Sequence, residues 1–282
     1  MKQKPRTTMV VIVSDLHCGS TVAVSPPEVL LDDGGFFRAS KAQQWLWQNW
    51  LAFWAEVKAQ RKASNARLMV VVNGDLTEGA HHGSTQVLSG NPAAQAVVVN
   101  EVLRIPLALN PDHWLFVRGT EAHVGPSAAY EERVASGLFK DGRPVIRDDA
   151  TGTYSHWHAK VMIDGVRLDF AHHGRMGQRS WTKPNVVLNL AAEIFYEHAA
   201  RNIPHPHIAV RSHQHRFVDT HDAHPTRVIQ TPAWQLATAY IHRIAPGSIA
   251  DVGGIIITVR DGRADVNPVI YHPDGPAEWR LP

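Results

Sequence analysis

Five apolar runs in this chain of 282 residues end in carboxylates and imidazoles. The first run, VVIVSDLHCGS (10–20), ends with Asp15 and His17, and ARLMVVVNGD (66–75) ends with Asp75. Because side chains at i and i+2 of an extended chain share a face, Asp15 and His17 are expected to point the same way. Buried strands that finish in polar groups are typical of open α/β sheets, whose sites lie at the carboxyl ends of the strands.

Three later runs end in the same way. They are DHWLFVRGTEAH (112–123), HAKVMIDGVRLDFAHHG (158–174) and HIAVRSHQH (207–215). The second of them is predicted to be a hairpin that turns at Asp164-Gly165, and 254–272 is predicted to be another that turns at Asp261-Gly262. The polar ends of the three runs add six candidate ligands, which are Glu121, His123, His172, His173, His213 and His215.

Segments with helical periodicity separate the strands. The clearest is 40–62, where Ser40 and Gln43 form a capping-box pattern. A single stripe of this helix is formed by Trp47, Trp50, Leu51, Trp54 and Val57. Further helices are predicted at 92–105, 127–139 and 186–200. The alternation of strands and helices predicts an α/β fold with two facing mixed β-sheets sandwiched between helices, in a single domain over 1–282. We expect the two halves of the chain to supply one sheet each.

The composition excludes several classes of protein. The formal net charge of +2 gives no strong footprint for nucleic acid or a membrane surface. The single cysteine, Cys18, excludes an internal disulfide and fits a reducing compartment. The apolar run that follows the basic start MKQKPRTT is too short for a signal peptide or a membrane span. We therefore expect a cytoplasmic protein with no membrane partner.

Histidine is the most unusual residue type, with 18 in the chain. Together with the acids at the strand ends, these imidazoles outnumber the ligands of one tetrahedral ion. Carboxylate and imidazole ligands without a cysteine cluster suit zinc, manganese or iron. The sequence therefore predicts a two-metal site, in which ions about 3.5–4 Å apart share a bridging carboxylate and a water.

The motifs resemble those of a known family. DLH, NGD, GTEAH, AHH and SHQH occur in the order of the calcineurin-like metallophosphoesterase motifs D-x-H, G-D, G-N-H-[DE], H and G-H-x-H. The chain also resembles the stand-alone phosphoesterases of phage and prophage genomes, which carry a histidine pair after the G-D motif, as His81 and His82 do here. The resemblance implies the four-layer fold of this family and a phosphoesterase activity.

The resemblance also implies roles for the ligands. Asp15, His17 and His215 would hold the first metal, and Asp75 would bridge the two metals. The second metal would take His213 together with His172 or His173. We favour His172, because the first histidine of such a pair is usually the ligand in relatives, and leave His173 open.

One departure from the family pattern concerns the third motif. Thr120 stands where relatives have an asparagine ligand, and the histidine that would follow it directly comes later, at His123. Either Glu121 replaces the asparagine, with His123 as the general acid, or Thr120 contributes its hydroxyl. We favour Glu121, because a carboxylate is the better ligand for a hard dication.

The expected activity is hydrolysis of a phosphodiester or phosphomonoester, with a nucleotide or a short nucleic acid favoured as substrate. Two divalent ions are expected, with Mn²⁺ favoured over Fe, Zn and Ni. Hydroxide held between them would attack phosphorus, and His123 would protonate the leaving group. Candidate substrate contacts are Asn73, Arg118, Arg211, His81 and His82.

The sequence is less consistent with three other functions. A metal-binding scaffold of the same fold without catalysis is the main alternative, and the altered third motif is its only support. A DNA nuclease is disfavoured by the near-neutral charge. A metal-storage protein would account only for the histidine count. The sequence leaves the oligomeric state undetermined.

Overall fold

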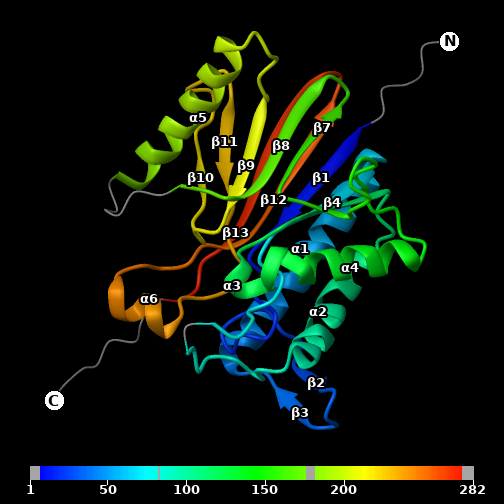
Figure 1. Ribbon diagram of the computed structural model, residues 1–282, viewed down its shortest axis with the longest axis vertical. Coiled ribbons are helices and arrows are strands. Elements are labelled where there is room, and N and C mark those ends of the chain that lie inside the picture. The colour runs from blue at the N-terminus through cyan, green and yellow to red at the C-terminus, as the bar shows by residue number, and fades with distance from the viewer. Residues whose placement is uncertain (1–6, 82, 176–181, 275–282) are drawn as a thin grey trace.

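Two β-sheets pack face to face in the protein, with helices on both outer faces (Figure 1). The computed structural model describes residues 7–81, 83–175 and 182–274. The strands are β1 (Thr8–Val13), β2 (Glu28–Leu30), β3 (Phe36–Arg38), β4 (Arg67–Asn73), β5 (His113–Val117), β6 (Ser155–His156), β7 (His158–Ile163), β8 (Val166–His173), β9 (Ile208–Ser212), β10 (Val218–Asp219), β11 (Arg227–Gln230), β12 (Val252–Arg260) and β13 (Arg263–Tyr271). The helices are α1 (Lys41–Ser64), α2 (Pro92–Leu107), α3 (Glu121–Val124), α4 (Ala129–Lys140), α5 (Lys183–Ala200) and α6 (Ala239–Ile244), with a 3₁₀ turn at Pro126–Ala128.

The first sheet has the strand order β13-β12-β1-β4-β5-β6. Its strands β1, β4, β5 and β6 run parallel, and β12 pairs antiparallel with β1. The hairpin of β12 and β13 turns at Asp261-Gly262 as predicted. This hairpin corrects one expectation, because it lies in the sheet of the first half of the chain. A tight hairpin fixes only its own pairing, so its place in a sheet depends on contacts distant in sequence.

The second sheet has the order β10-β11-β9-β8-β7. Strands β8, β9 and β11 run parallel, and β7 pairs antiparallel with β8 through the turn at Asp164-Gly165. The register between β8 and β9 shifts between Phe170 and His173. Such an irregularity re-aims the side chains beside it, and here it lies at the polar end of β8. The predicted α/β class with two mixed sheets is confirmed.

Strand β1 is buried on both faces, which explains its unbroken apolar sequence. Val10 and Ile12 belong to the core between the two sheets, and Val11 and Val13 belong to the core under helices α1 and α2. The alternation follows from the two-residue period of a strand. Helix α5 covers the outer face of the second sheet through a smaller cluster that includes Val187. Together these clusters make four layers, in the order helix, sheet, sheet, helix.

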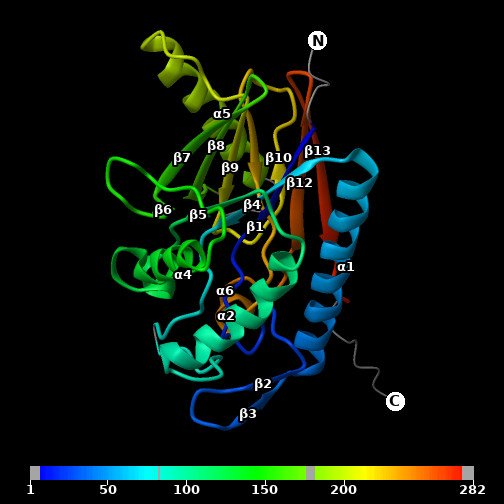
Figure 2. The same ribbon diagram turned by 90° about the vertical axis from the view of Figure 1, so that its right-hand side faces the viewer.

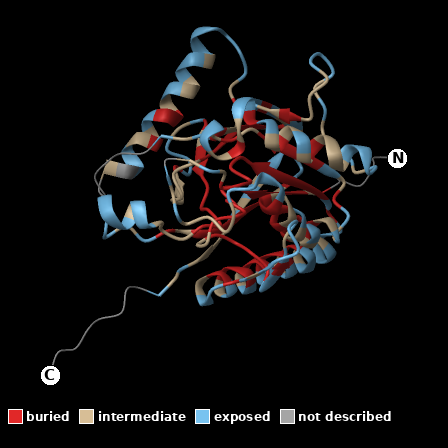
Figure 3. Ribbon diagram, turned by 60° about the horizontal axis from the view of Figure 1, so that its bottom comes forward, coloured by how far each residue is buried: buried red, intermediate tan, exposed pale blue. Residues whose placement is uncertain are grey.

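Helix α1 begins at the predicted capping box, in which Ser40 and Gln43 exchange side-chain and backbone hydrogen bonds. It runs beside β12 (Figure 2). Its buried face carries Trp50 and Trp54, and the ring of Trp50 packs edge-on against Trp234 at a centroid distance of 4.7 Å. The three tryptophans and Val57 of the predicted stripe thus pack in the core, whereas Leu51 is exposed (Figure 3).

No helix within the described ranges combines the length and the apolar character needed to cross a lipid bilayer.

Candidate metal centre

The candidate site forms where the loops after β1 and β4 lie against each other. Asp15 N–H donates to the carbonyl of Gly74 at 3.0 Å, and His17 N–H donates to the carbonyl of Asp75 at 3.0 Å. Parallel neighbours such as β1 and β4 end at the same edge of a sheet, so their following residues meet there. Two of the predicted motifs are therefore held side by side by backbone hydrogen bonds.

Five of the predicted ligands adopt a left-handed backbone conformation. The φ angles are 50° for Asp15, 42° for His17, 52° for Asp75, 74° for His213 and 52° for His215. Non-glycine residues rarely occupy this region, which costs of order 1–3 kcal/mol for each residue. Such strain persists where surrounding structure fixes it, and it is common at functional sites. These turns aim the five side chains into one space.

The first group of converging side chains is Asp15, His17 and His215. The Nε2 atom of His215 lies 3.4 Å from Oδ1 of Asp15 and 3.2 Å from Nε2 of His17. Asp15 is fully buried and His17 nearly so. Two imidazole nitrogens and a carboxylate oxygen at these distances form a set of ligands for one cation.

The second group is Asp75, His172 and His213. Oδ2 of Asp75 lies 3.0 Å from Nε2 of His172 and 3.9 Å from Nδ1 of His213. The same oxygen lies 4.0 Å from Nε2 of His17, which belongs to the first group. Asp75 therefore lies between the two groups.

Buried polar atoms without a hydrogen-bond partner show whether this site fits metal ions. Within the described chain, Oδ1 of Asp15 and Nε2 of His172 are buried and have no hydrogen-bond partner of good geometry. Buried polar atoms are normally paired, so each such exception needs an explanation. Cations bound between the two groups would satisfy both atoms. The mixed oxygen and nitrogen donors also suit zinc, manganese or iron.

The protonation of the site is consistent with cation binding. Burial raises the pKa of Asp15, but the hydrogen bond and charge of His215 outweigh burial and lower the pKa to about 2. Burial likewise raises the pKa of Asp75, and His172 holds that pKa well below its usual value. Burial lowers the pKa of His172, whereas the charge of Asp75 raises it to about 9. The two carboxylates are therefore ionised at neutral pH, as metal ligands must be, whereas His172 carries a proton that a bound cation would have to replace.

Asn73, predicted to contact substrate, has a different role in the structure. Its carbonyl accepts a hydrogen bond from Nδ1 of His172 at 2.7 Å, which turns Nε2 toward Asp75. Its side-chain amide donates to Oγ of Ser212 at 2.6 Å and to the carbonyl of Ala171 at 3.1 Å. Asn73 is fully buried. These bonds make Asn73 a positioning residue behind the ligands.

Glu78 was not anticipated from the sequence. Its Oε2 lies 3.0 Å from Nδ1 of His17 and accepts a hydrogen bond from Gln235 at 2.9 Å. Burial raises the pKa of the Glu78 carboxyl, but His17 and His81 outweigh burial and lower it. A carboxylate behind a ligating imidazole fixes the ring orientation and strengthens the ligand. The sequence feature that could have indicated Glu78 is its position three residues after Asp75, in the same loop.

Thr120, rather than Glu121, reaches the two groups. Thr120 N–H donates to Oδ1 of Asp75 at 2.6 Å, and its hydroxyl lies 3.2 Å from Oδ2 of Asp75 and 3.2 Å from Nδ1 of His213. The carboxylate of Glu121 instead accepts a hydrogen bond from Ser127 N–H at 2.9 Å. Among the described residues, Glu121 belongs to none of the ligand groups. As the first residue of α3, Glu121 lies at the exposed side of the loop.

The two histidines at the end of β8 differ in burial. His172 is buried within the second group, whereas His173 is exposed. The His173 ring lies 5.1 Å from the ring of His213, between centroids, and His173 is in none of the described ligand groups. Successive side chains of a strand point to opposite faces, so only one of the pair turns inward.

The two arginines predicted to contact substrate are engaged elsewhere. Arg118 donates to Oγ of Ser155 at 3.0 Å, and its guanidinium lies 5.4 Å from the centroid of the Trp157 ring. Arg211 is buried and pairs with Asp169 at 2.9 Å. Neither arginine lines the large cavity described next. Their partners therefore hold both guanidinium groups away from the two ligand groups.

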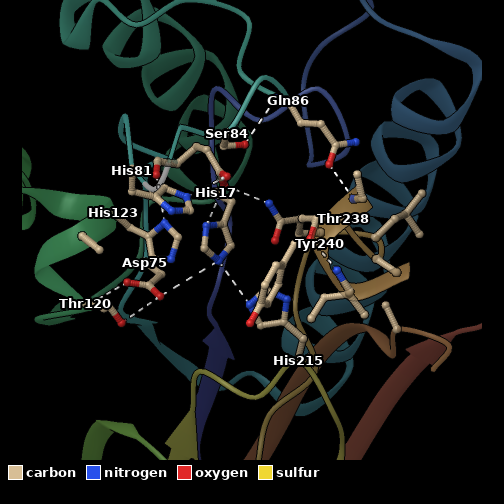
Figure 4. Close-up of a pocket in the computed structure, with 18 of the residues that line it drawn as sticks. His17, Asp75, His81, Ser84, Gln86, Thr120, His123, His215, Thr238 and Tyr240 are labelled. Atoms are coloured by element: carbon tan, nitrogen blue, oxygen red, sulfur yellow. Dashed lines mark hydrogen bonds and ion pairs between the residues drawn. The ribbon is translucent and has the colours of Figure 1, made fainter. Parts of the chain in front are cut away.

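A cavity of about 940 Å³ opens in front of the site (Figure 4). His17, Asp75, Thr120, His213 and His215 line one side, and residues of 235–250, including Tyr240, line another. His81 and His123 also line this cavity and contact each other, with ring centroids 4.2 Å apart. His82 lies outside the described residues.

Comparisons with known proteins identify similar solved structures. No family model matches the chain, and no curated protein matches it. The fold is similar to vacuolar protein sorting 29 from Cryptosporidium parvum, with 10% identity, a TM-score of 0.44, and coverage of 95% of this chain and 100% of that one. It is also similar to a dimetal phosphatase from Danio rerio, with 11% identity, a TM-score of 0.41, and coverage of 95% and 100%.

A third similar structure is the 5′-nucleotidase from Candida albicans. The identity is 14% and the TM-score 0.41, and the match covers 83% of this chain and 47% of that one. Since all three identities are low and all three TM-scores are below 0.5, the functional interpretation depends on the side chains of the site itself.

Proposed function

We propose that the protein hydrolyses phosphate esters with two divalent metal ions bound by the two ligand groups. The observation that carries the proposal is the position of Asp75. Its Oδ2 atom lies 3.0 Å from Nε2 of His172 and 4.0 Å from Nε2 of His17. A carboxylate placed between two ligand sets is the arrangement of a bridging ligand in a two-metal hydrolase. The motif order, which resembles that of the calcineurin-like metallophosphoesterases, supports the same function.

Each ion has a proposed ligand set. Asp15, His17 and His215 would hold one ion, His172 and His213 the other, and Asp75 would serve both. Two bound dications would supply Lewis-acid activation of a water and charge neutralisation at the phosphoryl oxygens. We favour Mn²⁺ as the native metal, and the ligand types also suit iron, zinc and nickel.

The residues around the ligands hold them in place for this chemistry. Glu78 faces the outer nitrogen of His17, and the carbonyl of Asn73 binds the outer nitrogen of His172. Thr120 holds both oxygens of Asp75. Because these partners fix the imidazole and carboxylate orientations, the ligands need little rearrangement when a cation binds.

We retain His123 as the proposed contact for the leaving group, but a lowered pKa restricts its role as a proton donor. Burial lowers the pKa of His123 to about 4, and the neighbouring His17 lowers it as well. Bound cations would lower it further, because like charges disfavour the protonated ring. At neutral pH His123 is therefore a neutral imidazole, and protonation of a leaving group would require the ring to take up a proton first. Proton donation by His123 stays a prediction.

The cavity supports a substrate much larger than phosphate. Its volume of about 940 Å³ is at the upper end of the range of sites for small organic ligands. Opposite the ligands, Tyr240 offers an exposed aromatic ring, and the guanidinium of Arg243 lies 5.5 Å from the centroid of that ring. An aromatic face beside a cation suits a stacked base. We therefore favour a nucleotide or a short single-stranded nucleic acid over a simple alkyl phosphate.

The activity is tested by supplying metal-stripped protein with Mn²⁺, Zn²⁺, Fe²⁺ or Ni²⁺ and measuring hydrolysis of two model esters. Turnover of bis(p-nitrophenyl) phosphate indicates a diesterase, and turnover of p-nitrophenyl phosphate alone indicates a monoesterase. Nucleotides and short oligonucleotides follow as natural candidates. Metal binding without turnover of any ester would favour the scaffold alternative. Failure to bind metal at all would overturn the proposal.

A further inference from the structure

A third cluster of metal-binding side chains lies beside the two groups described above. Glu78, His81 and His123 each offer one ligand atom, and these atoms lie within 4.8 Å of one another. The cluster has a ring contact with the first group, because the centroids of His17 and His123 are 4.5 Å apart. It shares no residue with the Asp15 group or with the Asp75–His172–His213 group, but His123 also forms a possible ligand set with His17 and Asp75, so the cluster directly adjoins the two-metal centre.

The two oxygens of Glu78 face different neighbours. Oε2 faces His17 and accepts a hydrogen bond from Gln235, whereas Oε1 lies 3.1 Å from Nε2 of His81. The carboxylate is almost wholly buried. Glu78 therefore orients His17 with Oε2 alone, and its Oε1 is left for a separate partner.

The hydrogen bond of His123 determines which of its nitrogens is available. Nδ1 of His123 lies 2.9 Å from the backbone carbonyl of Glu78. A carbonyl only accepts hydrogen bonds, so the proton of the neutral ring is on Nδ1 and the lone pair is on Nε2. Ligating histidines in proteins show this arrangement, in which one nitrogen donates to a carbonyl and the other binds the metal. The carbonyl of Asn73 serves His172 in the same way.

The cluster is open to solvent-filled space. His81 and His123 line both the large cavity and a second cavity of about 420 Å³ on their other side. Glu78 lines the large cavity as well. A set of two imidazoles and one carboxylate with an open side is the ligand set of catalytic zinc sites, in which the remaining position takes a water or a substrate oxygen.

We infer that Glu78, His81 and His123 form a third divalent-cation site, of the zinc type, next to the proposed two-metal centre. Its open position faces the large cavity, where an oxygen of a phosphate ester would lie. The inference deepens the proposed function, because it gives Nε2 of His123 to a cation in place of a direct contact with the leaving group. Its test is the number of bound ions and does not depend on turnover.

The decisive measurement is the metal content of the purified full chain after saturation with Zn²⁺ and removal of free metal. Wild type is expected to retain three ions per chain, two in the two-metal centre and one at the third site. His81→Ala and His123→Ala are each expected to retain one ion fewer than wild type. His81 is a partly exposed loop residue, so His81→Ala is expected to fold, and circular dichroism and thermal melting check both variants. His221→Ala, in an exposed loop outside all the groups, is the matched control and is expected to retain the wild-type number.

The outcomes separate this inference from the proposed function. Two ions in wild type, with no loss in His81→Ala and His123→Ala, would overturn the third site and leave the two-metal centre intact. Three ions in wild type that persist in both folded variants would also overturn it. No bound ion in wild type would remove both proposals. Crystals soaked in Zn²⁺ add a direct readout, because an anomalous peak is expected between Oε1 of Glu78 and the rings of His81 and His123, and an empty position there would contradict the inference.

Discussion

Nδ1 of His17 lies 3.0 Å from Oε2 of Glu78, and both side chains are almost wholly buried. The contact links a proposed metal ligand to a carboxylate that the sequence motifs did not single out. It also explains how a buried imidazole keeps its other nitrogen turned toward Asp15 and His215.

Glu78→Gln tests this relationship. The amide keeps the shape of the side chain but removes the negative charge that His17 faces, so affinity for the ions is expected to fall by about 10- to 100-fold. Calorimetric titration of metal-stripped protein with Mn²⁺ measures the change. Glu101→Gln, on the exposed face of α2, is the control. Equal affinities in the two variants would contradict the orienting role of Glu78.

Asp75→Asn tests the shared ligand. An amide oxygen is a weaker ligand than a carboxylate and carries no charge, so both proposed ions lose their common partner. Since loss of a mere orienting partner costs about 10- to 100-fold, loss of this ligand is expected to reduce phosphoesterase activity by more than about 100-fold. Kinetic assay together with elemental analysis measures the effect. Asp265→Asn, on β13, is the control, and unchanged metal content with unchanged rate would refute the bridging assignment.

Gly119→Ala tests how closely the backbone packs against Asp75. A Cβ atom at position 119 would lie 2.3 Å from the backbone nitrogen of Asp75 and 2.4 Å from its Oδ1. The clash must displace the Asp75 loop, so metal affinity is expected to drop and the free energy of unfolding to fall by about 1–3 kcal/mol. Gly137→Ala is the control, because that helical position is open and alanine there is expected to stabilise by up to about 1 kcal/mol.

Glu131→Gln tests a buried acid on α4. Burial raises the pKa of Glu131 to about 8 from an ordinary value of 4.5, and the charge of Asp75 raises it as well. Between pH 4.5 and about pH 8, Glu131 of the folded protein holds a proton that the unfolded chain has released. The free energy of unfolding of the wild type therefore falls as pH rises. The loss attributable to Glu131 is on the order of 4 kcal/mol across this window.

The difference between wild type and Glu131→Gln isolates this contribution. The variant is expected to match wild type near pH 5, where glutamine replaces a protonated acid of similar shape, and to be the more stable protein at pH 9. Urea unfolding at several pH values, with a chelator present, measures both free energies. A difference that does not change with pH would show that Glu131 is ionised in the folded protein.

Tyr240→Ala tests the far wall of the cavity. Loss of a stacking partner is worth about 1–3 kcal/mol per base, so KM for a nucleotide substrate is expected to rise by about 5- to 150-fold while kcat changes little. An alkyl phosphate, which has no ring to stack, is expected to be unaffected. Tyr196→Ala removes an equally exposed tyrosine on α5 and serves as the control. The same loss with both substrates would indicate a structural role for Tyr240.

The expected elements agree with the structure wherever the pattern was long and periodic. The buried strands, the capping box of α1 and both Asp-Gly hairpins form as predicted. The short elements β2, β3, β10, β11 and α6 were not anticipated, because two to six residues give little periodicity. The membership of the β12–β13 hairpin in the first sheet was also missed, since it depends on contact with β1, more than two hundred residues away.

At the site, the amino-acid sequence by itself determined which residues end the buried strands, because an unbroken apolar run marks such a strand and polar residues mark where it stops. Together with the resemblance of the motifs, this predicted Asp15, His17, Asp75, His172, His213 and His215 as neighbours, and also Glu121 and, as an alternative to His172, His173. Only the tertiary structure decided that Thr120 reaches Asp75 while Glu121 does not, that Arg118 and Arg211 are engaged elsewhere, and that Glu78 stands behind His17. The reason is that the periodicity of a sequence indicates the face on which a side chain lies. Its contacts depend instead on how segments that are distant in sequence pack against each other.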